Sequence, residues 1–403
     1  MPPKSRRRYS RAPAIFAVSL LLVSMASAVE FKVLYKFQGG VDGAYPYASL
    51  IFDAAGNLYG TTNYGGVYDY GTVFRLTPNP DGSWSETVIY SFTDTNGDGA
   101  LPYASLIFDT AGNLYGTTYY GGAYKKGTVF KLAPNPDGSW SESVIHSFRA
   151  RHGTNPYAGV IFDTAGNLYG TTWSGGLYHL GTAFKLTPNP DGSWSESVIH
   201  NFNGEGGGHP SAGLVLDAAG NLYGTTYTGG RSKCGTAFKL TPNPHGTWTK
   251  TKLQAFKGPN GCHPYVSLIL DAAGNLYGTT VYGGAHGYGT AFKLTPNPDG
   301  SWTRTKLHAF KGPDGNDPEG ELTLDAAGNL YGTTFWGGAY NQGTIFKLTP
   351  SPDGNWTRST LHAFKGGDGF GPTAGIIPDA AGNLYGTTES GGKGYGVVFR
   401  ITP

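Results

Sequence analysis

Two histidines and two carboxylates stand beside prolines in this 403-residue chain, and they are its candidates for acid–base chemistry. His209 and His263 each precede a proline, and Asp317 and Glu319 flank another one. With tyrosines at the matching places of other repeats, such a set could act on a polysaccharide, as a lyase or as a hydrolase with two carboxylates. Scattered polar residues on a rim would give the same spacing, so that interpretation stays open.

Aromatic residues make up 14% of the chain, and a few of them break its repeating pattern. Six of the eight tryptophans recur at one position and are interpreted as structural, whereas Trp173 and Trp336 fall outside that series. Together with Tyr70 and Tyr288 they are the candidate ligand contacts, because flat rings present a large apolar area at little entropic cost. Sugar rings are the expected ligand. The alternative is that these side chains only pack the fold.

One segment has the spacing of a calcium loop. Asp94, Asn96 and Asp98 place oxygen atoms at alternate positions next to glycines, as in loops of the D-x-N-x-D-G type. Ser105 stands where an EF-hand would place its bidentate glutamate, and a strand is expected to follow instead of a helix. A structural calcium ion is therefore one expectation, and a solvated loop without any cofactor is the other.

The only two cysteines, Cys234 and Cys262, belong to one repeat and lie on the same predicted face. In an exported protein such a pair is expected to form a disulfide. Closing a loop of about 29 residues would stabilise the fold by roughly 3 to 4 kcal/mol in the chain-entropy account. Neither cysteine has the CxxC context of a redox catalyst.

The elements that must position these residues come from a repeat of the form D-[AT]-A-G-N-L-Y-G-T-T. It occurs seven times, at intervals of about 54 residues, which is typical of a propeller or an array. Each copy contains four apolar stretches that are separated by A-G-N and P-D-G turns and by a Gly-Gly loop. The leading residues of the seven copies are Asp53, Asp109, Asp163, Asp217, Asp271, Asp325 and Asp379.

The chain is therefore predicted to form an all-β, seven-bladed β-propeller with four antiparallel strands per blade. The last copy reaches only its third strand, and residues 31–37 match the missing fourth strand in register. We expect this N-terminal strand to close the seventh blade and so protect the sheet edges. Residues 29–403 would form a single propeller domain.

The first 28 residues have the features of a signal peptide. Five basic residues precede a short apolar run, 14–25, and Ala26, Ser27 and Ala28 form a small-residue cleavage site. The mature chain is expected outside the cytoplasm, in the periplasm or the medium, without a membrane span. Removing the leader leaves 24 basic against 27 acidic residues. This balance argues against a nucleic-acid partner.

The repeat, followed by Gly-Gly and then by Gly-Thr-x-Phe-Lys-Leu, resembles the GloVer tandem-repeat proteins of bacteria, also described as choice-of-anchor proteins. The resemblance covers residues 31–403. It implies an envelope-associated repeat fold and brings no catalytic residues with it.

Two functions are consistent with the sequence. The first is an exported, non-catalytic propeller that binds a glycan or a cell-envelope partner as a monomer, through the variable aromatic loops on one face. The second is a carbohydrate-active enzyme, a polysaccharide lyase or glycoside hydrolase, acting at the mouth of the central channel through His209, His263, Asp317 and Glu319. The variable loops are the expected functional face because binding residues commonly lie on loops that a rigid scaffold supports.

Overall fold

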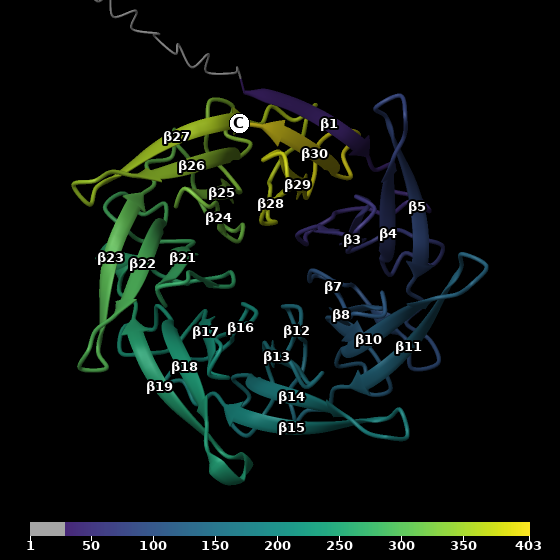
Figure 1. Cartoon of the computed structure of the whole chain (residues 1–403), viewed down its shortest axis with the longest axis horizontal. Coiled ribbons are helices and arrows are strands. Elements are labelled where there is room, and N and C mark those ends of the chain that lie inside the picture. The colour runs from purple at the N-terminus through teal and green to yellow at the C-terminus, as the bar shows by residue number, and fades with distance from the viewer. Residues whose placement is uncertain (1–28) are drawn as a thin grey trace, which may run out of the picture.

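The computed structural model describes residues 29–403, and the predicted leader lies outside the described residues. Seven four-stranded antiparallel sheets surround a central axis, as Figure 1 shows. The predicted all-β, seven-bladed propeller is confirmed. The described part of the chain contains no α-helix, only two 3-10 turns at Pro244–Gly246 and Gly258–Asn260. None of its helices is long and apolar enough to cross a membrane.

Each sheet runs from a very short innermost strand to a long outermost strand. The first three blades comprise β2 (Ile51–Phe52), β3 (Leu58–Thr62), β4 (Thr72–Pro78) and β5 (Trp84–Ser91); β7 (Ile107–Phe108), β8 (Leu114–Thr118), β10 (Thr128–Pro134) and β11 (Trp140–Ser147); and β12 (Ile161–Phe162), β13 (Leu168–Thr172), β14 (Thr182–Pro188) and β15 (Trp194–Asn201). The next three comprise β16 (Val215–Leu216), β17 (Leu222–Thr226), β18 (Thr236–Pro242) and β19 (Trp248–Ala255); β20 (Ile269–Leu270), β21 (Leu276–Thr280), β22 (Thr290–Pro296) and β23 (Trp302–Ala309); and β24 (Thr323–Leu324), β25 (Leu330–Thr334), β26 (Thr344–Pro350) and β27 (Trp356–Ala363).

The seventh blade combines both ends of the described chain. Its strands are β28 (Ile377–Pro378), β29 (Leu384–Thr388), β30 (Val397–Thr402) and β1 (Glu30–Lys36). The strand β1 pairs antiparallel with β30, so that Phe31 lies opposite Ile401 (Figure 1). A further two-stranded sheet, β6 (Gly99–Ala100) with β9 (Tyr120–Gly121), ties the link before the second blade to a loop of that blade.

The leading aspartate of each repeat organises the hairpin between the first two strands. One oxygen of Asp163 accepts the backbone N–H groups of Ala165 and Asn167, both at 2.9 Å. The other accepts the Asn167 amide at 2.7 Å and the Tyr169 hydroxyl at 3.0 Å. Burial by itself would raise the pKa of the Asp163 carboxyl, but these hydrogen bonds outweigh it and lower that pKa. The D-x-A-G-N-L-Y part of the repeat is thus a turn-forming unit, and all seven copies make the same bonds.

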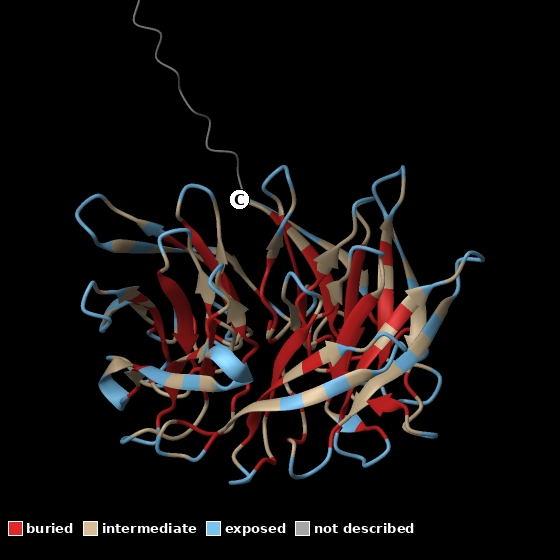
Figure 2. Cartoon of the chain, turned by 60° about the horizontal axis from the view of Figure 1, so that its bottom comes forward, coloured by how far each residue is buried: buried red, intermediate tan, exposed pale blue. Residues whose placement is uncertain are grey.

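The hydrophobic core lies between neighbouring blades, and Figure 2 shows the buried residues concentrated in the middle strands. Between the first two blades, Tyr59 packs against Phe108, with ring centroids 5.2 Å apart, and against Trp140, at 6.2 Å. The equivalent Tyr and Trp meet at five other interfaces. A Cβ on Gly60 would lie only 2.6 Å from the Phe74 ring, which explains why a glycine follows the tyrosine. The recurring tryptophans are therefore structural.

Candidate functional site at the channel mouth

The links between blades and the loops between second and third strands form one face. Backbone bridges join them, such as Ala44 with Tyr64 and Asn316 with Trp336. The residue before the proline of each link adopts a φ between 52° and 63° in every blade. At six of these seven residues the N–H bonds to a carbonyl of the preceding blade, as from His209 to Leu180 at 2.7 Å. Local backbone geometry thus fixes how the rim side chains point.

The two predicted histidines are held in the loops of this face by hydrogen bonds and ring contacts. His209 donates from Nδ1 to the Trp173 carbonyl at 3.0 Å, and its ring lies 5.0 Å from the Trp173 ring. His263 does the same toward Tyr227, with a 2.8 Å hydrogen bond and stacked rings 4.4 Å apart. Because a carbonyl only accepts, each Nδ1 carries its proton. Neither histidine is among the residues that line the central cavity.

The two predicted carboxylates come from the link into the sixth blade. Burial raises the pKa of Asp317 to about 6, and its Oδ1 is buried without a hydrogen-bond partner. Burial, reinforced by the negative charges of Asp317 and Glu389, raises the pKa of Glu319 to about 8. Of the predicted four-residue arc, only Glu319 borders the central cavity. Asp317 acts on Glu319 from the rim, and both histidines are hydrogen-bonded into the surrounding loops.

Two further carboxylates join them, and sequence reasoning missed both. Glu321 lines the cavity, and burial raises its pKa against the opposing hydrogen bonds from Ser267. Glu389 accepts the Tyr47 hydroxyl at 2.6 Å, and burial raises its pKa as well. A signal was present in the sequence, because the places equivalent to Glu321 hold only Ser or Gly: Ser49, Ser105, Gly159, Gly213, Ser267 and Gly375.

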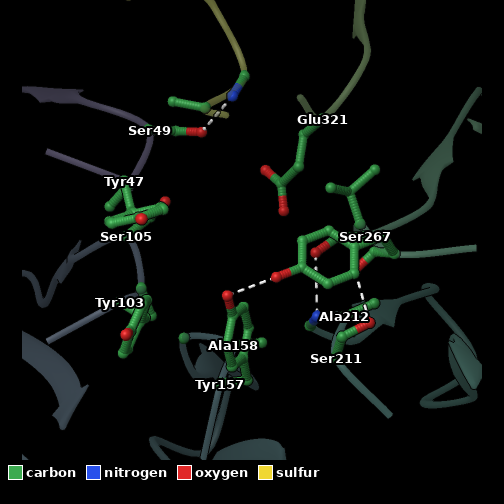
Figure 3. A pocket seen from close by; sticks show the side chains of 18 of the residues that line it. Tyr47, Ser49, Tyr103, Ser105, Tyr157, Ala158, Ser211, Ala212, Ser267 and Glu321 are labelled. Atoms are coloured by element: carbon green, nitrogen blue, oxygen red, sulfur yellow. Dashed lines mark hydrogen bonds between the residues drawn. The ribbon is translucent and has the colours of Figure 1, made fainter. Parts of the chain in front are cut away.

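Glu319 and Glu321 border a cavity of about 330 Å³ in the central channel (Figure 3). The side chains after the link prolines form its upper ring, where Tyr103 stacks on Tyr157 with ring centroids 5.0 Å apart and Tyr47 lies 5.2 Å from Tyr103. The hydroxyl of Tyr265 donates to that of Tyr157. Glu319 faces this aromatic arc from the sixth blade.

Below the tyrosines, small polar residues connect neighbouring blades. The Gly213 N–H donates to Ser267 Oγ at 3.0 Å, and the Gly375 N–H donates to Ser49 Oγ at 2.9 Å. Glu321 replaces the small residue in the sixth blade, and its carboxyl group points into the channel in Figure 3. Glu321 is half-buried and borders the cavity. The channel is thus a polar-edged pocket with acidic groups on one side only.

Exposed aromatic side chains are confined to this face. All eleven exposed tyrosines and tryptophans among residues 29–403 lie in loops between second and third strands: Tyr64, Tyr68, Tyr70, Tyr120, Tyr124, Tyr178, Tyr282, Tyr288, Trp336, Tyr340 and Tyr395. Three of the four predicted ligand contacts are among them, with exposures of 39% for Tyr70, 42% for Tyr288 and 37% for Trp336. Trp173 is half-buried, because its ring packs against His209 and Tyr227.

The calcium candidates have protein partners of their own. Asp94 pairs with Lys125 at 2.8 Å. One oxygen of Asp98 accepts the Tyr90 hydroxyl at 3.1 Å and the Thr93 N–H at 2.8 Å, and the other accepts the Gly99 N–H at 2.6 Å. Asn96, at a φ of 53°, lines a surface pocket with Asp98. Within residues 29–403 no three His, Cys, Asp or Glu side chains are grouped to hold a metal ion.

Asp98 also has counterparts in other links. The Asp314 carboxylate accepts the Lys311 N–H at 2.7 Å and contacts the His308 ring at 2.9 Å, and Asp42 accepts the Gln38 N–H and the Tyr35 hydroxyl. Holding the link is thus the recurring role of this aspartate.

The predicted disulfide is present. Cys234 and Cys262 are bonded, with Cα atoms 4.5 Å apart, and they join the second-to-third strand loop of the fourth blade to the link that leaves it. The His263 N–H donates to the Cys234 carbonyl at 2.8 Å, so the bridge lies at a junction that is also hydrogen-bonded.

The chain is similar to known proteins in sequence and in fold. A family model described as the Gloeobacter/Verrucomicrobia repeat matches residues 15–141, 135–323 and 298–403. No curated protein matches the sequence.

Two solved structures share the fold. One is described as the extracellular domain of a one-component system from B. thetaiotaomicron, with a TM-score of 0.56 and 12% identity over 91% of this chain and 39% of that one. The other is an ancestral GH74 enzyme, with a TM-score of 0.57 and 12% identity over 89% of this chain and 48% of that one. This chain spans less than half the length of either protein, and at this identity the similarity concerns the fold alone.

Proposed function

The chain belongs to the Gloeobacter/Verrucomicrobia repeat family, and we propose that this member is an exported, non-catalytic propeller that binds a glycan of the cell envelope or its surroundings. The binding surface is the loop face that surrounds the channel mouth. The single observation that carries the proposal is that all eleven exposed Tyr and Trp side chains of residues 29–403 lie in the loops of this face.

Such a distribution is not needed for folding. The aromatic residues that stabilise the blades, such as Tyr59 and Trp140, are buried or half-buried between sheets. Exposed aromatic rings that gather on one face are unfavourable in water, and a patch of this kind is typical of a binding surface. Sugar rings match them, because their apolar C–H faces stack on aromatic rings while polar groups at the rim accept hydrogen bonds.

Two features of the chain support export. The leader has a basic start, an apolar run and a small-residue cleavage site. The cysteine pair forms a disulfide, which persists in oxidising compartments.

A glycan array on the purified protein tests the proposal, followed by titration of each ligand against Trp336→Ala and Tyr288→Ala. Both side chains are exposed, so these variants should keep the wild-type melting temperature, and each should weaken binding about tenfold, or about 1.4 kcal/mol. Lys306→Ala, an exposed change on the outer strand β23, is the matched control and should bind normally. Unchanged affinity in both aromatic variants would exclude these loops as the site.

One observation favours a second function, a polysaccharide lyase or glycoside hydrolase at the channel mouth. The pKa of Glu319 lies at about 8 and that of Asp317 at about 6, so a protonated and an ionised carboxyl coexist near neutral pH. Release of new chain ends from a bound polysaccharide, abolished in Glu319→Gln, would establish this activity. If prolonged incubation gives no depolymerisation, the enzymatic function is refuted and only the binding function remains.

A further inference from the structure

The channel cavity has an uncompensated acidic side. Among residues 29–403, Glu319 and Glu321 are the only charged residues that line it, and no Lys, Arg or His of this part of the chain does so. Asp317 and Glu389 act on Glu319 from the rim. Among the described residues none of these four carboxyls forms an ion pair. Carboxyls that are buried near one another without a cation destabilise the folded protein. A positively charged group that enters the cavity would therefore be bound favourably.

Much of the remaining cavity wall is aromatic. Tyr47, Tyr103, Tyr157 and Tyr265 line it, and their rings contact one another in sequence at 5.2, 5.0 and 5.6 Å. Ring faces attract cations through their quadrupole, and this effect is largest where water is excluded. A cavity of about 330 Å³ is far larger than a metal ion needs and falls at the lower end of the range for small organic ligands.

We propose that the channel cavity binds an organic ammonium group, namely the free amino group of an amino-sugar residue, between the tyrosine arc and Glu319 and Glu321. The inference rests on the proposed glycan-binding function and names the ligand class within it. The exposed loops would hold the rest of the glycan, and the cavity would select chains that carry a free amine.

Binding should release a proton. Without a ligand, burial and the neighbouring Asp317 and Glu389 hold the pKa of Glu319 at about 8, so this carboxyl is largely protonated at pH 7. The other groups that face it are Tyr157, Tyr265, Tyr227 and Tyr282, whose pKa values are all raised and which therefore stay neutral. An ammonium ion that enters stabilises the ionised Glu319 and lowers its pKa, so the carboxyl loses its proton.

Isothermal titration with a tetramer of glucosamine and with its fully N-acetylated counterpart tests the proposal. The two probes share the same sugar chain and differ at the nitrogen, which is a charged free amine in the first and a neutral acetylated amide in the second. The wild type should bind the glucosamine tetramer at least tenfold more tightly, and titration near pH 6.5 in two buffers of different ionisation enthalpy should report proton release. Absence of binding by the glucosamine tetramer, or equal affinity for the two, would overturn the proposal.

Substitutions in the cavity test whether the preference for the free amine arises there. Glu321→Gln and Glu319→Gln should each remove it, and Glu319→Gln should also remove the proton release. Both changes reduce repulsion among carboxyls, so neither should lower the melting temperature. Glu205→Gln, which removes one exposed carboxylate from another link of the same face, is the control and should keep the preference. A preference that persists in both cavity variants would place the amine elsewhere and refute the inference.

The outcome also separates this inference from the proposed function. Equal binding of both tetramers that is lost in Trp336→Ala would refute the amine site and leave the glycan-binding face standing. An amine preference that survives in Trp336→Ala and Tyr288→Ala, without any neutral ligand on the array, would refute the aromatic face and leave the channel site standing.

Discussion

Glu86 and Glu142 show how one residue position adapts to each blade interface. The third residue of the outermost strand points toward the link that precedes the blade. In the fourth and fifth blades it is Lys250 and Arg304, which donate to backbone carbonyls of the links. In the first two blades a glutamate stands there instead, with one oxygen buried and without a hydrogen-bond partner. Burial, with the nearby charge of Asp42 or Asp98, raises the pKa of Glu86 and of Glu142 to about 7.

These two glutamates should make the stability depend on pH. A carboxyl whose pKa is raised by folding contributes stability below its unfolded value of about 4.5, and that contribution is lost as the pH rises through about 7. The free energy of unfolding of the double variant, Glu86→Gln with Glu142→Gln, should therefore rise relative to that of the wild type as the pH increases from 5 to 8. We expect about 1 kcal/mol per site at most, because both side chains are partly hydrated.

Urea unfolding of the wild type and the double variant at several pH values between about 4 and 8 measures this difference. Glu205→Gln serves as the control, since it removes an exposed carboxylate and leaves Glu86 and Glu142 in place. Parallel profiles for the double variant and the wild type would show that the two glutamates are as well hydrated in the folded state as in the unfolded one.

At the scale of elements, the repeated contact between loop and link explains what the disulfide adds. In other blades the same junction is held by backbone hydrogen bonds, for example from Leu101 to the Tyr70 carbonyl at 2.9 Å. The bond between Cys234 and Cys262 reinforces this junction in the fourth blade, whose loop bears Arg231 and Lys233 and none of the exposed aromatic residues.

Removing the disulfide should therefore cost less than the chain-entropy estimate. The variant Cys234→Ser with Cys262→Ser should stay folded and lose about 1 to 3 kcal/mol of the free energy of unfolding. Mass spectrometry of the exported wild type without reductant should give a mass about 2 Da below the dithiol form. Two thiols that can be alkylated under native, non-reducing conditions would contradict the bridge.

At the scale of the whole molecule, the ring depends on the contacts of β1. Phe31 stacks on His362 of the sixth blade, with ring centroids 3.8 Å apart, and Phe37 is fully buried against Phe74 of the first blade. Thr387 Oγ1 and the Gly375 N–H of the seventh blade bond to Ala48 and Ser49 of the first. The seventh blade is thus held to both of its neighbours in the ring.

A chain that begins at Gly39 should lose this closure. It lacks β1 and leaves β30 as an open edge, and it loses the burial of Phe31, Val33 and Phe37, which contribute about 1.5 to 3 kcal/mol each when fully buried. We expect a much lower melting temperature and a broader, less cooperative transition. A chain that begins at Glu30 is the control and should unfold like the wild type. An unchanged transition for the shorter chain would refute the role of β1.

Much of the architecture could be predicted from the sequence. The period of the repeat, the A-G-N and P-D-G turns and the match of residues 31–37 to the other fourth strands can be read from the sequence because the copies are nearly identical. The disulfide followed from two cysteines in one repeat. The loop face followed from the order of the strands, since alternate connections of a meander lie on opposite sides.

The candidate site could be predicted only in part. Comparison of equivalent positions in the repeats proposed His209, His263, Asp317 and Glu319, of which only Glu319 borders the cavity. The rings of the two histidines are held by hydrogen bonds to neighbouring carbonyls. The local sequence alone determined the blades, their order and the face on which variation occurs. Only the tertiary structure decided which side chains meet at the channel and which carboxyls become protonated there, because proximity and burial arise between residues of different blades across the ring.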